Sequence, residues 1–462
     1  MTLIKSISGI RGTIGGSAGE GLTPLDTVKF TAAYGSWLIN RNKSEKITVV
    51  IGRDARISGP MISDLVVSTL NGLGIDVIDL GLSTTPTVEI AVPMENAKGG
   101  IIITASHNPK QWNALKLLNE KGEFISAEDG AEVLEIAENG SSRYAEVDHL
   151  GSVSQDNTYL DKHIEAVLKL KAVNPSLIKD AQFTVVVDAV NSTGGIFVPA
   201  LLRALGVDNI IELYCEPTGN FPHNPEPLPE NLTEISSLIK ANQADLGIVV
   251  DPDVDRLAFV CEDGSMFGEE YTLVAIADYV LSKTPGNTVS NLSSTISLRE
   301  ITEKYEGCQY HASAVGEVNV VDKMKAVNAI IGGEGNGGVI YPESHYGRDA
   351  LVGIGLFLTQ LAASGKKATE LRADYPNYFI SKNKIQLEEG MDVDGILKNV
   401  ANSYTEQEVD TTDGVKIYFG SEWVHLRKSN TEPIIRIYSE SASEAKANEL
   451  AQQIMDKIRT LV

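Results

Sequence analysis

Short runs of apolar, mostly β-branched residues recur along the chain, and most of them end at a small polar or glycine-rich loop. A run of about four to eight such residues is typical of a buried strand in a parallel sheet. Between several of these runs, apolar residues recur at helical spacing instead. Strands that alternate with helices in this way predict an α/β fold. The predicted strands are 47–51, 77–80, 101–103, 184–187 and 288–292, and the predicted helices are 25–38, 61–73, 159–170 and 298–305.

One arrangement of strand, polar loop and helix occurs three times, starting at strands 48–51, 184–187 and, in a weaker copy, 288–292. We therefore predict three related, doubly wound α/β units of roughly 100 to 150 residues each, a usual domain size. The polar stretch 139–157 contains few apolar residues and is the predicted linker after the first unit.

The pattern changes after Tyr375 and Pro376. Residues 416–419 and 423–426 have the pattern of two strands joined by a hairpin, and 434–438 adds a third strand. Ser443 is predicted to cap a final helix whose apolar face covers these strands. A small C-terminal α+β domain follows from this pattern. The four predicted domains are 1–152, 153–257, 258–374 and 375–462.

The net charge and the number and spacing of the cysteines limit which partners and which cellular compartment are expected. The 462 residues include 39 basic and 62 acidic ones, a net charge of −23, which repels nucleic acid and anionic membranes. A phosphorylated ligand would therefore need a local basic pocket. The chain has neither a signal peptide's apolar stretch near its start nor any apolar run of about 18 residues, so no membrane partner and no export are predicted. Three widely spaced cysteines predict neither a disulfide framework nor a zinc site, which favours a reducing cytoplasm.

The loop Thr104 to Pro109 (TASHNP) directly follows predicted strand 101–103 and holds Ser106 beside His107. The bounding glycines and the β-branched run indicate a central parallel strand. In open α/β sheets, ligands bind outside the carboxyl ends of the strands. Ser106 is therefore a candidate nucleophile. The alternative is an ordinary strand-to-helix turn, in which serine and asparagine are common.

Asp251, Asp253 and Asp255 alternate directly after an apolar strand. A bend in this segment can gather their oxygens about one cation, and a purely oxygen donor set favours magnesium over zinc. The strand is too apolar to be an exposed edge, although a solvated acidic edge is the alternative. An Asp-x-Asp sequence also opens aspartyl phosphatases, in which the first aspartate, here Asp251, would be the nucleophile.

Two further loops have the residues expected of ligand sites. Residues 329–339 (AIIGGEGNGGV) place Glu334 and Asn336 among glycines, so a sugar ring could approach the backbone while these side chains bind its hydroxyls. No Gly-Lys-Ser/Thr follows, which excludes a nucleotide phosphate loop. Residues 427–436 hold Arg427 and Arg436 with a lysine and two hydroxyls, an anion site in a very acidic chain. The alternative for residues 329–339 is a flexible turn, and the alternative for residues 427–436 is a structural loop.

Taken together, these motifs resemble those of the α-D-phosphohexomutases, which move phosphate between O1 and O6 of a hexose. The resemblance covers the chain from Arg11 to Arg436 and implies four domains around a central cleft. It implies that Ser106 carries a phosphate and that the three aspartates bind Mg²⁺, with a phosphate oxygen on Ser106 as the fourth ligand. It also implies that Arg256 and the sugar-loop residues bind substrate. The implied distal phosphate site is Arg427, Ser429, Asn430, Thr431 and Arg436.

One position departs from this resemblance. Many relatives have a histidine, a proposed proton-transfer residue, where this chain has Gly338. Acid–base catalysis is then expected from Lys116, Arg11 or His107. Arg11 lies between Gly9 and Gly12, which would let a ligand approach, although a plain turn has the same pattern. Lys116 matches a lysine near the family's scissile phosphate, and a solvated helix lysine is its alternative.

The resemblance predicts an intramolecular phosphotransferase that acts through a phosphoserine and a hexose 1,6-bisphosphate, which also serves as activator. The sequence GEGNGGV favours glucosamine phosphate as the sugar, with glucose and mannose phosphates as alternatives. A magnesium-dependent phosphatase and a non-catalytic sugar-phosphate sensor remain as alternatives of other classes. The predicted partner is a small phosphorylated sugar, and the sequence does not predict an oligomeric state.

Overall fold

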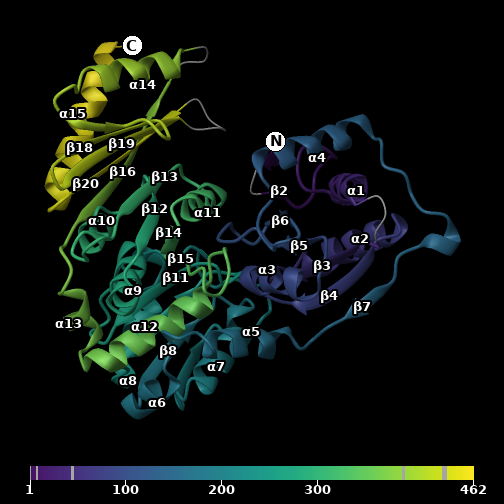
Figure 1. The fold of residues 1–462 in the computed structure, drawn as a ribbon, viewed down its shortest axis with the longest axis horizontal. Helices are drawn as coiled ribbons and strands as arrows, with labels where there is room; N and C mark the ends of the chain where they lie inside the picture. Colours follow the sequence, from purple (N-terminus) through teal and green to yellow (C-terminus); the bar gives the residue numbers. More distant parts are fainter. Residues whose placement is uncertain (1, 7–8, 43–45, 388–390, 429–433, 462) are drawn as a thin grey trace. The chain divides into compact units, whose positions relative to one another are not determined.

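The computed structural model describes residues 2–6, 9–42, 46–387, 391–428 and 434–461. The chain divides into two compact units. Figure 1 gives the labels of the helices and strands. Unit 1 comprises Met1–Thr272 and Gly338–Thr369, and unit 2 comprises Leu273–Gly337 and Glu370–Val462. Helices α9 (Glu269–Lys283) and α13 (Ala368–Arg372) cross from one unit to the other. The units are described separately below.

The first sheet of unit 1 is mixed. Strand β5, the predicted strand 101–103, is buried throughout and lies between parallel β3 and antiparallel β6. Its central position is thus confirmed, but the parallel pairing holds on one side only, because residues 104–111 turn the chain straight back into β6. The sheet order is β1 (Ile4–Ser6), β2 (Gly9–Thr13), β6 (Trp112–Leu118), β5 (Gly99–Ile103), β3 (Thr48–Arg53), β4 (Asp76–Leu82) and β7 (Val153–Gln155).

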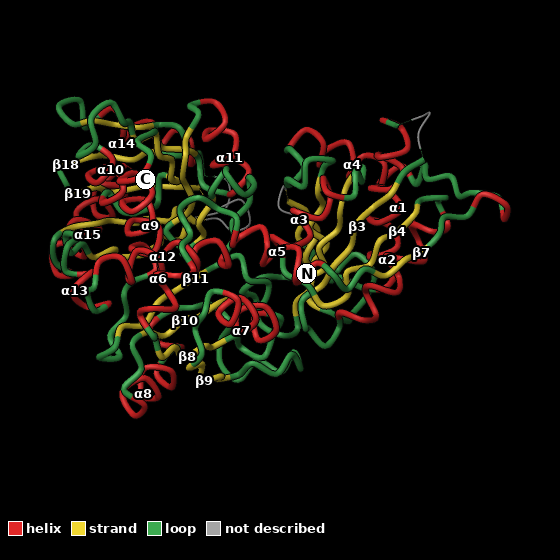
Figure 2. Tube along the Cα trace, turned by 60° about the horizontal axis from the view of Figure 1, so that its bottom comes forward, coloured by secondary structure: helices red, strands yellow, loops and turns green. Residues whose placement is uncertain are grey.

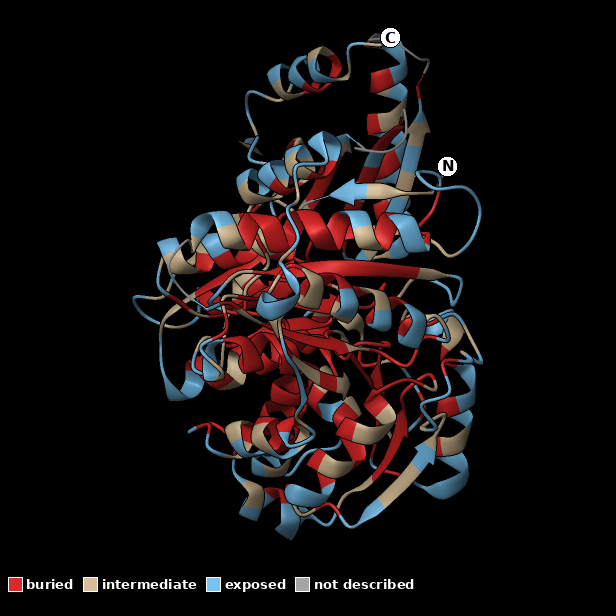
Figure 3. Cartoon of the chain, turned by 90° about the vertical axis from the view of Figure 1, so that its right-hand side faces the viewer, coloured by how far each residue is buried: buried red, intermediate tan, exposed pale blue. Residues whose placement is uncertain are grey.

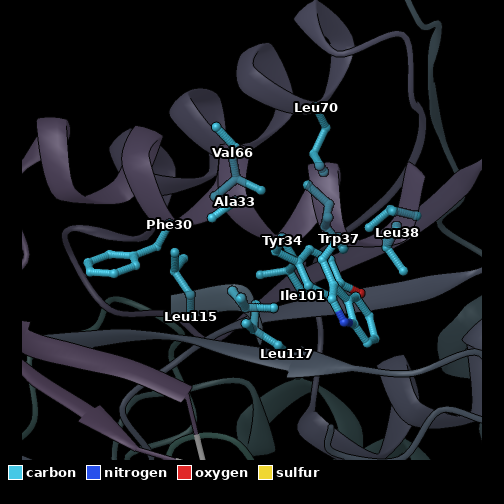
Figure 4. Close-up of a cluster of buried hydrophobic side chains, with 14 of the residues drawn as sticks. Phe30, Ala33, Tyr34, Trp37, Leu38, Val66, Leu70, Ile101, Leu115 and Leu117 are labelled. Carbon is cyan, nitrogen blue, oxygen red and sulfur yellow. The ribbon is translucent and has the colours of Figure 1, made fainter. Parts of the chain in front are cut away.

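Both faces of this sheet are covered, because successive residues of a strand point to opposite sides. Ile101 and Ile103 join one core, and Ile102 joins the other. The first core includes side chains of α1 (Pro24–Arg41), α2 (Gly59–Gly72) and α4 (Ala127–Asn139). Figure 2 labels these three helices, and Figure 4 shows the side chains that α1, α2 and the sheet contribute. The second core packs against α3 (Thr85–Met94). Helices predicted at 25–38 and 61–73 are confirmed as α1 and α2.

Residues 139–157 differ in part from the predicted linker. They include a short 3-10 helix, η1 (Val147–His149), and strand β7, which pairs with the edge strand β4. All three residues of β7 are exposed, so no apolar signal marked it in the sequence.

The second sheet of unit 1 has the order β11 (Leu257–Cys261), β10 (Leu246–Val250), β8 (Thr184–Asp188) and β9 (Asn209–Leu213). Strand β10, which leads to the three aspartates, is fully buried between its neighbours, so the prediction that it is not an edge is confirmed. The helices of this part are α5 (Tyr159–Leu168), α6 (Pro175–Ala181), α7 (Gly194–Ala204), η2 (Pro229–Asn231), α8 (Thr233–Asn242) and α12 (Ala350–Ser364), and β15 (Gly338–Ile340) precedes α12. Phe357 of α12 stacks on Phe259 of β11.

Unit 2 contains a set of parallel strands and a separate antiparallel sheet. In the first, β12 (Asn287–Asn291) pairs in parallel with β13 (Tyr310–Ser313) and β14 (Ala329–Glu334), and the helices are α10 (Ser297–Thr302) and α11 (Glu317–Ala326). The antiparallel sheet has the order β16 (Phe379–Gln386), β20 (Ile434–Ser441), β19 (Glu422–Lys428), β18 (Val415–Phe419) and β17 (Glu408–Asp410). Helices α14 (Val393–Asn402) and α15 (Glu444–Leu461) complete this part.

The C-terminal α+β domain is therefore confirmed, including its hairpin β18–β19. Ile454 and Ile458 of α15 lie in the core beneath the sheet, and the Ser443 hydroxyl accepts a hydrogen bond from Lys446 N (3.3 Å), as expected of a cap. Figure 3 shows that most central strands are buried and that many helices have one exposed face, whereas strands such as β7 and β16 are exposed or partly exposed. Within the described residues, no helix has both the length and the apolar composition needed to cross a membrane.

Candidate active site

Ser106 lies in the loop that follows β5, and its side chain is held at a defined place. Its φ of 48° is in the left-handed region, which non-glycine residues adopt rarely and at some cost. Its backbone N–H donates to Thr104 Oγ1 (3.0 Å), and its hydroxyl donates to Asp251 Oδ2 (2.7 Å). His107 Nδ1 lies 3.4 Å from the same hydroxyl. The structure thus brings the predicted nucleophile to the first of the predicted metal ligands.

A buried arginine, which the sequence analysis did not identify, holds this loop in shape. Arg56 is fully buried, and its Nε donates to Asp54 Oδ2 (3.0 Å). Its two remaining nitrogens donate to four backbone carbonyls, three in the loop and one at the start of β6. These are the carbonyls of Ser106, Asn108 (2.6 Å), Pro109 (2.8 Å) and Trp112 (3.0 Å). All five N–H groups of the guanidinium are thereby used, which only arginine can provide.

Replacing Arg56 with lysine should slow any reaction at Ser106 by about 10²-fold, because a lysine cannot hold four carbonyls and a 1 Å displacement of a reacting group has an effect of this size. The rate at saturating substrate measures this. Arg53→Lys is the matched control, since among the described residues Arg53 donates to a single carbonyl, that of Asp54 (3.2 Å). Equal rates in the Arg56 variant and the wild type would contradict the role of Arg56.

The three aspartates follow β10 in a tight turn in which Val254 has a φ of 62°. All three are fully buried, and one oxygen of each lies within 4.8 Å of the others. Asp251 Oδ1 accepts hydrogen bonds from the backbone N–H groups of Asp255 (3.2 Å) and Arg256 (3.1 Å). The prediction that a bend gathers these carboxylates is confirmed.

Other segments of unit 1 fix this turn from outside. The hydroxyls of Ser192 and Thr193 both donate to the carbonyl of Pro252 (2.7 and 3.0 Å). The backbone N–H of Thr85 donates to the carbonyl of Asp253 (2.9 Å), and its hydroxyl donates to Asp253 Oδ2 (2.5 Å). The turn is therefore held by the first residue of α3 and by the loop that precedes α7.

Two buried cations partly balance the three carboxylates. Lys116 Nζ lies 2.7 Å from Asp253 Oδ2 and 3.3 Å from Asp255 Oδ2, and Arg348 Nη2 lies 2.8 Å from Asp255 Oδ2. Burial alone would lower the pKa of Lys116, but Asp253 and Asp255 raise it above its ordinary value, so the ammonium stays charged. Lys116 is a buried residue of β6, and the alternative of a solvated helix lysine is wrong.

The carboxylates are suited to bind a cation. Burial and the neighbouring charges of Asp255 and Asp253 raise the pKa of Asp251. The buried Oδ1 atoms of Asp253 and Asp255 accept no hydrogen bond from any described residue. Buried oxygens without a partner are costly, and a hard cation would satisfy both while offsetting the repulsion. The residues present therefore fit a divalent metal.

The other predicted residues of unit 1 lie around this centre. Burial, followed by the charge of Arg256, lowers the pKa of Arg11. Burial and the same arginine also lower the pKa of His107, to about 2, so its imidazole is neutral. Arg256 itself pairs with Glu226 (Nη1 to Oε1, 3.2 Å). The structure thus brings the catalytic and metal residues predicted from the sequence together, and it adds Arg348 to them.

Glu334 lies in unit 2 at the carboxyl end of β14 and is nearly fully buried. Its Oε1 accepts hydrogen bonds from Asn291 Nδ2 (2.8 Å) at the end of β12 and from Gly316 N (3.2 Å) before α11. Gly335 N donates to Ser294 Oγ (2.9 Å). Three carboxyl-terminal loops of a parallel sheet therefore meet at Glu334, the usual position of a ligand site.

The predicted anion site includes a row of basic residues across the antiparallel sheet. Arg427 of β19 lies directly opposite Arg436 of β20, and Arg436 lies directly opposite Lys384 of β16. Directly opposed residues share one face, and like charges in such positions destabilise a sheet unless something neutralises them. Lys384 was not predicted. Ser429, Asn430 and Thr431 lie outside the described residues.

Comparison with known proteins places the chain in a family. Four family models match in order, for the phosphoglucomutase/phosphomannomutase alpha/beta/alpha domains I, II and III and its C-terminal domain. The matched residues are 3–144, 160–264, 268–378 and 382–457. The fold and the site thus define an isomerase of the phosphohexomutase class. The chain belongs to the phosphoglucomutase/phosphomannomutase family.

Individual relatives are similar over nearly their whole length. The phosphoglucomutase/phosphomannomutase of Thermococcus kodakarensis is 38% identical over 95% of this chain and 96% of the relative. A probable phosphoglucosamine mutase of Methanopyrus kandleri is 32% identical over 98% of this chain and 97% of the relative. A crystal structure of a phosphoglucomutase/phosphomannomutase family protein from Burkholderia thailandensis has a TM-score of 0.83 and 26% identity, covering 99% of this chain and 97% of that one.

Proposed function

We propose that the protein interconverts hexose 6-phosphate and hexose 1-phosphate through a phosphorylated Ser106 and a hexose 1,6-bisphosphate. The observation that carries this proposal is the 2.7 Å hydrogen bond from the Ser106 hydroxyl to Asp251, within a buried acidic triad. A strained, buried serine at such a site is arranged for phosphoryl transfer, because positioning and charge neutralisation supply most of the catalysis in this reaction.

In the first step, the bond from phosphorus to Ser106 Oγ breaks and a bond from phosphorus to a sugar hydroxyl oxygen forms. The hydroxyl proton leaves the sugar, and Ser106 Oγ regains a proton. The resulting bisphosphate turns end for end, and its other phosphoryl group returns to Ser106. The bisphosphate is then both the intermediate and, when it escapes, the activator that phosphorylates a free serine again.

The residues of unit 1 supply the electrostatic environment. Mg²⁺ is the metal we propose for the three aspartates, and when bound it would neutralise charge on the transferring phosphoryl group. Lys116 supplies positive charge at Asp253, to which its Nζ is paired at 2.7 Å. Arg348 does the same at Asp255. Arg11 and His107 are the remaining candidates for proton transfer near Ser106, and Arg256 is proposed to contact substrate.

Unit 2 holds the other residues for which we propose a role in substrate binding. Glu334, with Asn336, would bind the sugar hydroxyls, and Arg427 and Arg436 would bind the phosphate that is not reacting. Arginine can bind phosphate with two hydrogen bonds, and the opposed pair provides two such groups side by side. A contact at the distal phosphate contributes binding energy that positions the sugar hydroxyl.

For the sugar we propose glucosamine phosphate, which the GEGNGGV sequence and the name of the Methanopyrus kandleri relative support. Glucose and mannose phosphates are the second candidates, because the Thermococcus kodakarensis relative is a phosphoglucomutase/phosphomannomutase. These sugars differ at C2. Glu334 and Asn336 are proposed to bind O3 and O4, so these two residues do not distinguish the three sugars.

We further infer that the enzyme works in the cytoplasm as a reduced protein. None of its three cysteines, Cys215, Cys261 and Cys308, forms a disulfide. Its net charge of −23 makes a small phosphorylated sugar a better partner than nucleic acid.

Phosphorus NMR tests the function directly. Enzyme, Mg²⁺, a trace of hexose 1,6-bisphosphate and one hexose 6-phosphate should give the hexose 1-phosphate signal, and glucosamine 6-phosphate should react fastest of the three sugars. Omitting the bisphosphate should slow the start of the reaction, because an unphosphorylated serine cannot donate. Steady growth of an inorganic phosphate signal would instead indicate a phosphatase, and binding without any new signal would indicate a sensor.

A further inference from the structure

Asp413 lies in the turn between β17 and β18 and contacts two separate parts of unit 2. Its Oδ2 forms an ion pair with Arg427 Nε (2.6 Å). The same oxygen accepts a hydrogen bond from the backbone N–H of Val315 (2.9 Å) in the loop that precedes α11. Both charged side chains are largely covered, with exposed fractions of 24% for Arg427 and 21% for Asp413. One carboxylate thus joins the proposed phosphate site to the third α/β region.

The loop that Asp413 contacts is part of the proposed sugar site. Gly316, the residue after Val315, donates its N–H to Glu334 Oε1 (3.2 Å). The path from the phosphate-binding arginine to the sugar-binding glutamate therefore consists of one ion pair, one hydrogen bond, one peptide unit and a second hydrogen bond.

A second path joins the same two ends. His425 Nε2 donates to the carbonyl of Asp413 (2.7 Å), so its Nδ1 is the acceptor for the hydroxyl of Ser293 (3.0 Å). Ser293 N donates to Asn291 Oδ1 (2.9 Å), and Asn291 Nδ2 donates to Glu334 Oε1 (2.8 Å). Burial lowers the pKa of His425 to about 4, which agrees with a neutral ring that donates on one side and accepts on the other.

The turn that carries Asp413 has little freedom to move. The next residue, Gly414, has a φ of 73°, and a Cβ there would lie 2.1 Å from the carbonyl oxygen of Leu426, the residue before Arg427. Glycine is thus required, and the turn lies directly against the strand of the arginine. A contrasting pair is Lys428 with Asp394 (3.1 Å), in which the carboxylate is 76% exposed and has no second contact among the described residues.

We propose that Asp413 is a positioning residue that couples the sugar loop to the distal phosphate site, so that binding at one strengthens binding at the other. The proposal rests on the proposed function for the identity of these two sites. Glu334 and Arg427 have no direct contact in the described structure, so any coupling between them must pass through intermediate groups. Asp413 lies on both of these paths of ion pairs and hydrogen bonds, and the backbone of β19 also links His425 to Arg427.

A double-mutant cycle tests this inference. We would measure the Kd of the hexose 6-phosphate that wild type binds most tightly among glucosamine, glucose and mannose 6-phosphates. Glu334→Gln and Arg427→Ala should each weaken binding, and the two effects should deviate from additivity by about fivefold or more. In an Asp413→Ala background, the same two changes should become additive. A purely structural role would change stability and not this pairwise coupling.

Two further variants control the experiment. Asp394→Ala removes the neighbouring ion pair and should leave the coupling unchanged. Asp413→Asn keeps an acceptor for Val315 but not the charge, and it provides the test if the alanine variant does not fold. Additive effects in wild type, or coupling that persists without Asp413, would overturn the inference while leaving the proposed function intact. If neither Glu334→Gln nor Arg427→Ala altered the Kd, the placement of both sites, and the inference with it, would be wrong.

Discussion

Ser106→Ala should abolish phosphoryl exchange between hexose phosphates, with a fall in rate on the order of 10⁶-fold, as is found when an enzyme's nucleophile is removed. The proposed reaction has no other acceptor for the phosphoryl group, and the hydroxyl already points at Asp251 Oδ2 (2.7 Å). The purified wild-type protein should also carry phosphate on this serine in part. Peptide mapping by mass spectrometry, together with the exchange rate, measures both.

The fold should survive this substitution. The loop is held by Arg56 through backbone carbonyls, which alanine retains, so the thermal unfolding midpoint should change little. Ser63→Ala is a matched control, because Ser63 is 8% exposed, the same as Ser106, and lies within α2. It should retain full activity. Phosphate found only on other serines would contradict the mechanism, and an active Ser106 variant would favour Asp251 as nucleophile.

The sequence predicted those parts of the site that directly follow apolar strands. Ser106 follows β5, the aspartates follow β10 and Glu334 ends β14, so a local pattern marks each of them. The proximity of Ser106 to Asp251 could not be predicted in this way, because β5 and β10 belong to different sheets of unit 1. Strands β16 and β17 were not predicted, because β16 alternates intermediate and exposed residues and β17 has just three residues.

The residues that were not predicted from the sequence are placed at the site by tertiary structure. Arg56 lies next to the Ser106 loop because β3 and β5 are parallel neighbours, so the loops that follow them lie side by side. Arg348 arrives because the chain returns to unit 1 at Gly338 after the whole of β12–β14. Lys384 joins the basic row through the register of β16 against β20. No local sequence pattern indicates these pairings between strands. The spacing of Asp54 and Arg56, two residues apart, could nevertheless have suggested a buried ion pair.

Asp253→Asn should weaken Mg²⁺ binding on the order of 10²-fold and slow phosphoryl transfer accordingly. Replacing a residue that only hydrogen-bonds to a metal ligand typically lowers the metal affinity by about 10- to 100-fold. The Asp253 change goes further, because it removes the charge of a ligand itself. Burial would raise the pKa of Asp253, but Lys116 and the hydrogen bonds from Lys116 and Thr85 lower it below its ordinary value. The carboxylate is therefore ionised at neutral pH in wild type. Calorimetric titration with Mg²⁺ measures the affinity, and Asp263→Asn, an exposed change of equal charge, should leave it unchanged.

Thermal unfolding of wild type and of Asp253→Asn, with and without Mg²⁺, should show whether the three aspartates bind a metal or serve only the fold. Without Mg²⁺, the variant should unfold within a few degrees of wild type, because the loss of one ion pair to Lys116 is offset by weaker repulsion among the three carboxylates. With Mg²⁺ at about 100 times the wild-type Kd, wild type should gain about 2.7 kcal/mol, since a ligand that binds only the native state stabilises it by mass action. At the same concentration a variant with 10²-fold weaker binding has its site only half occupied, so it should gain about 0.4 kcal/mol. Equal stabilisation of both proteins would show that Mg²⁺ binds elsewhere, and the unpartnered oxygens of Asp253 and Asp255 would then need another explanation.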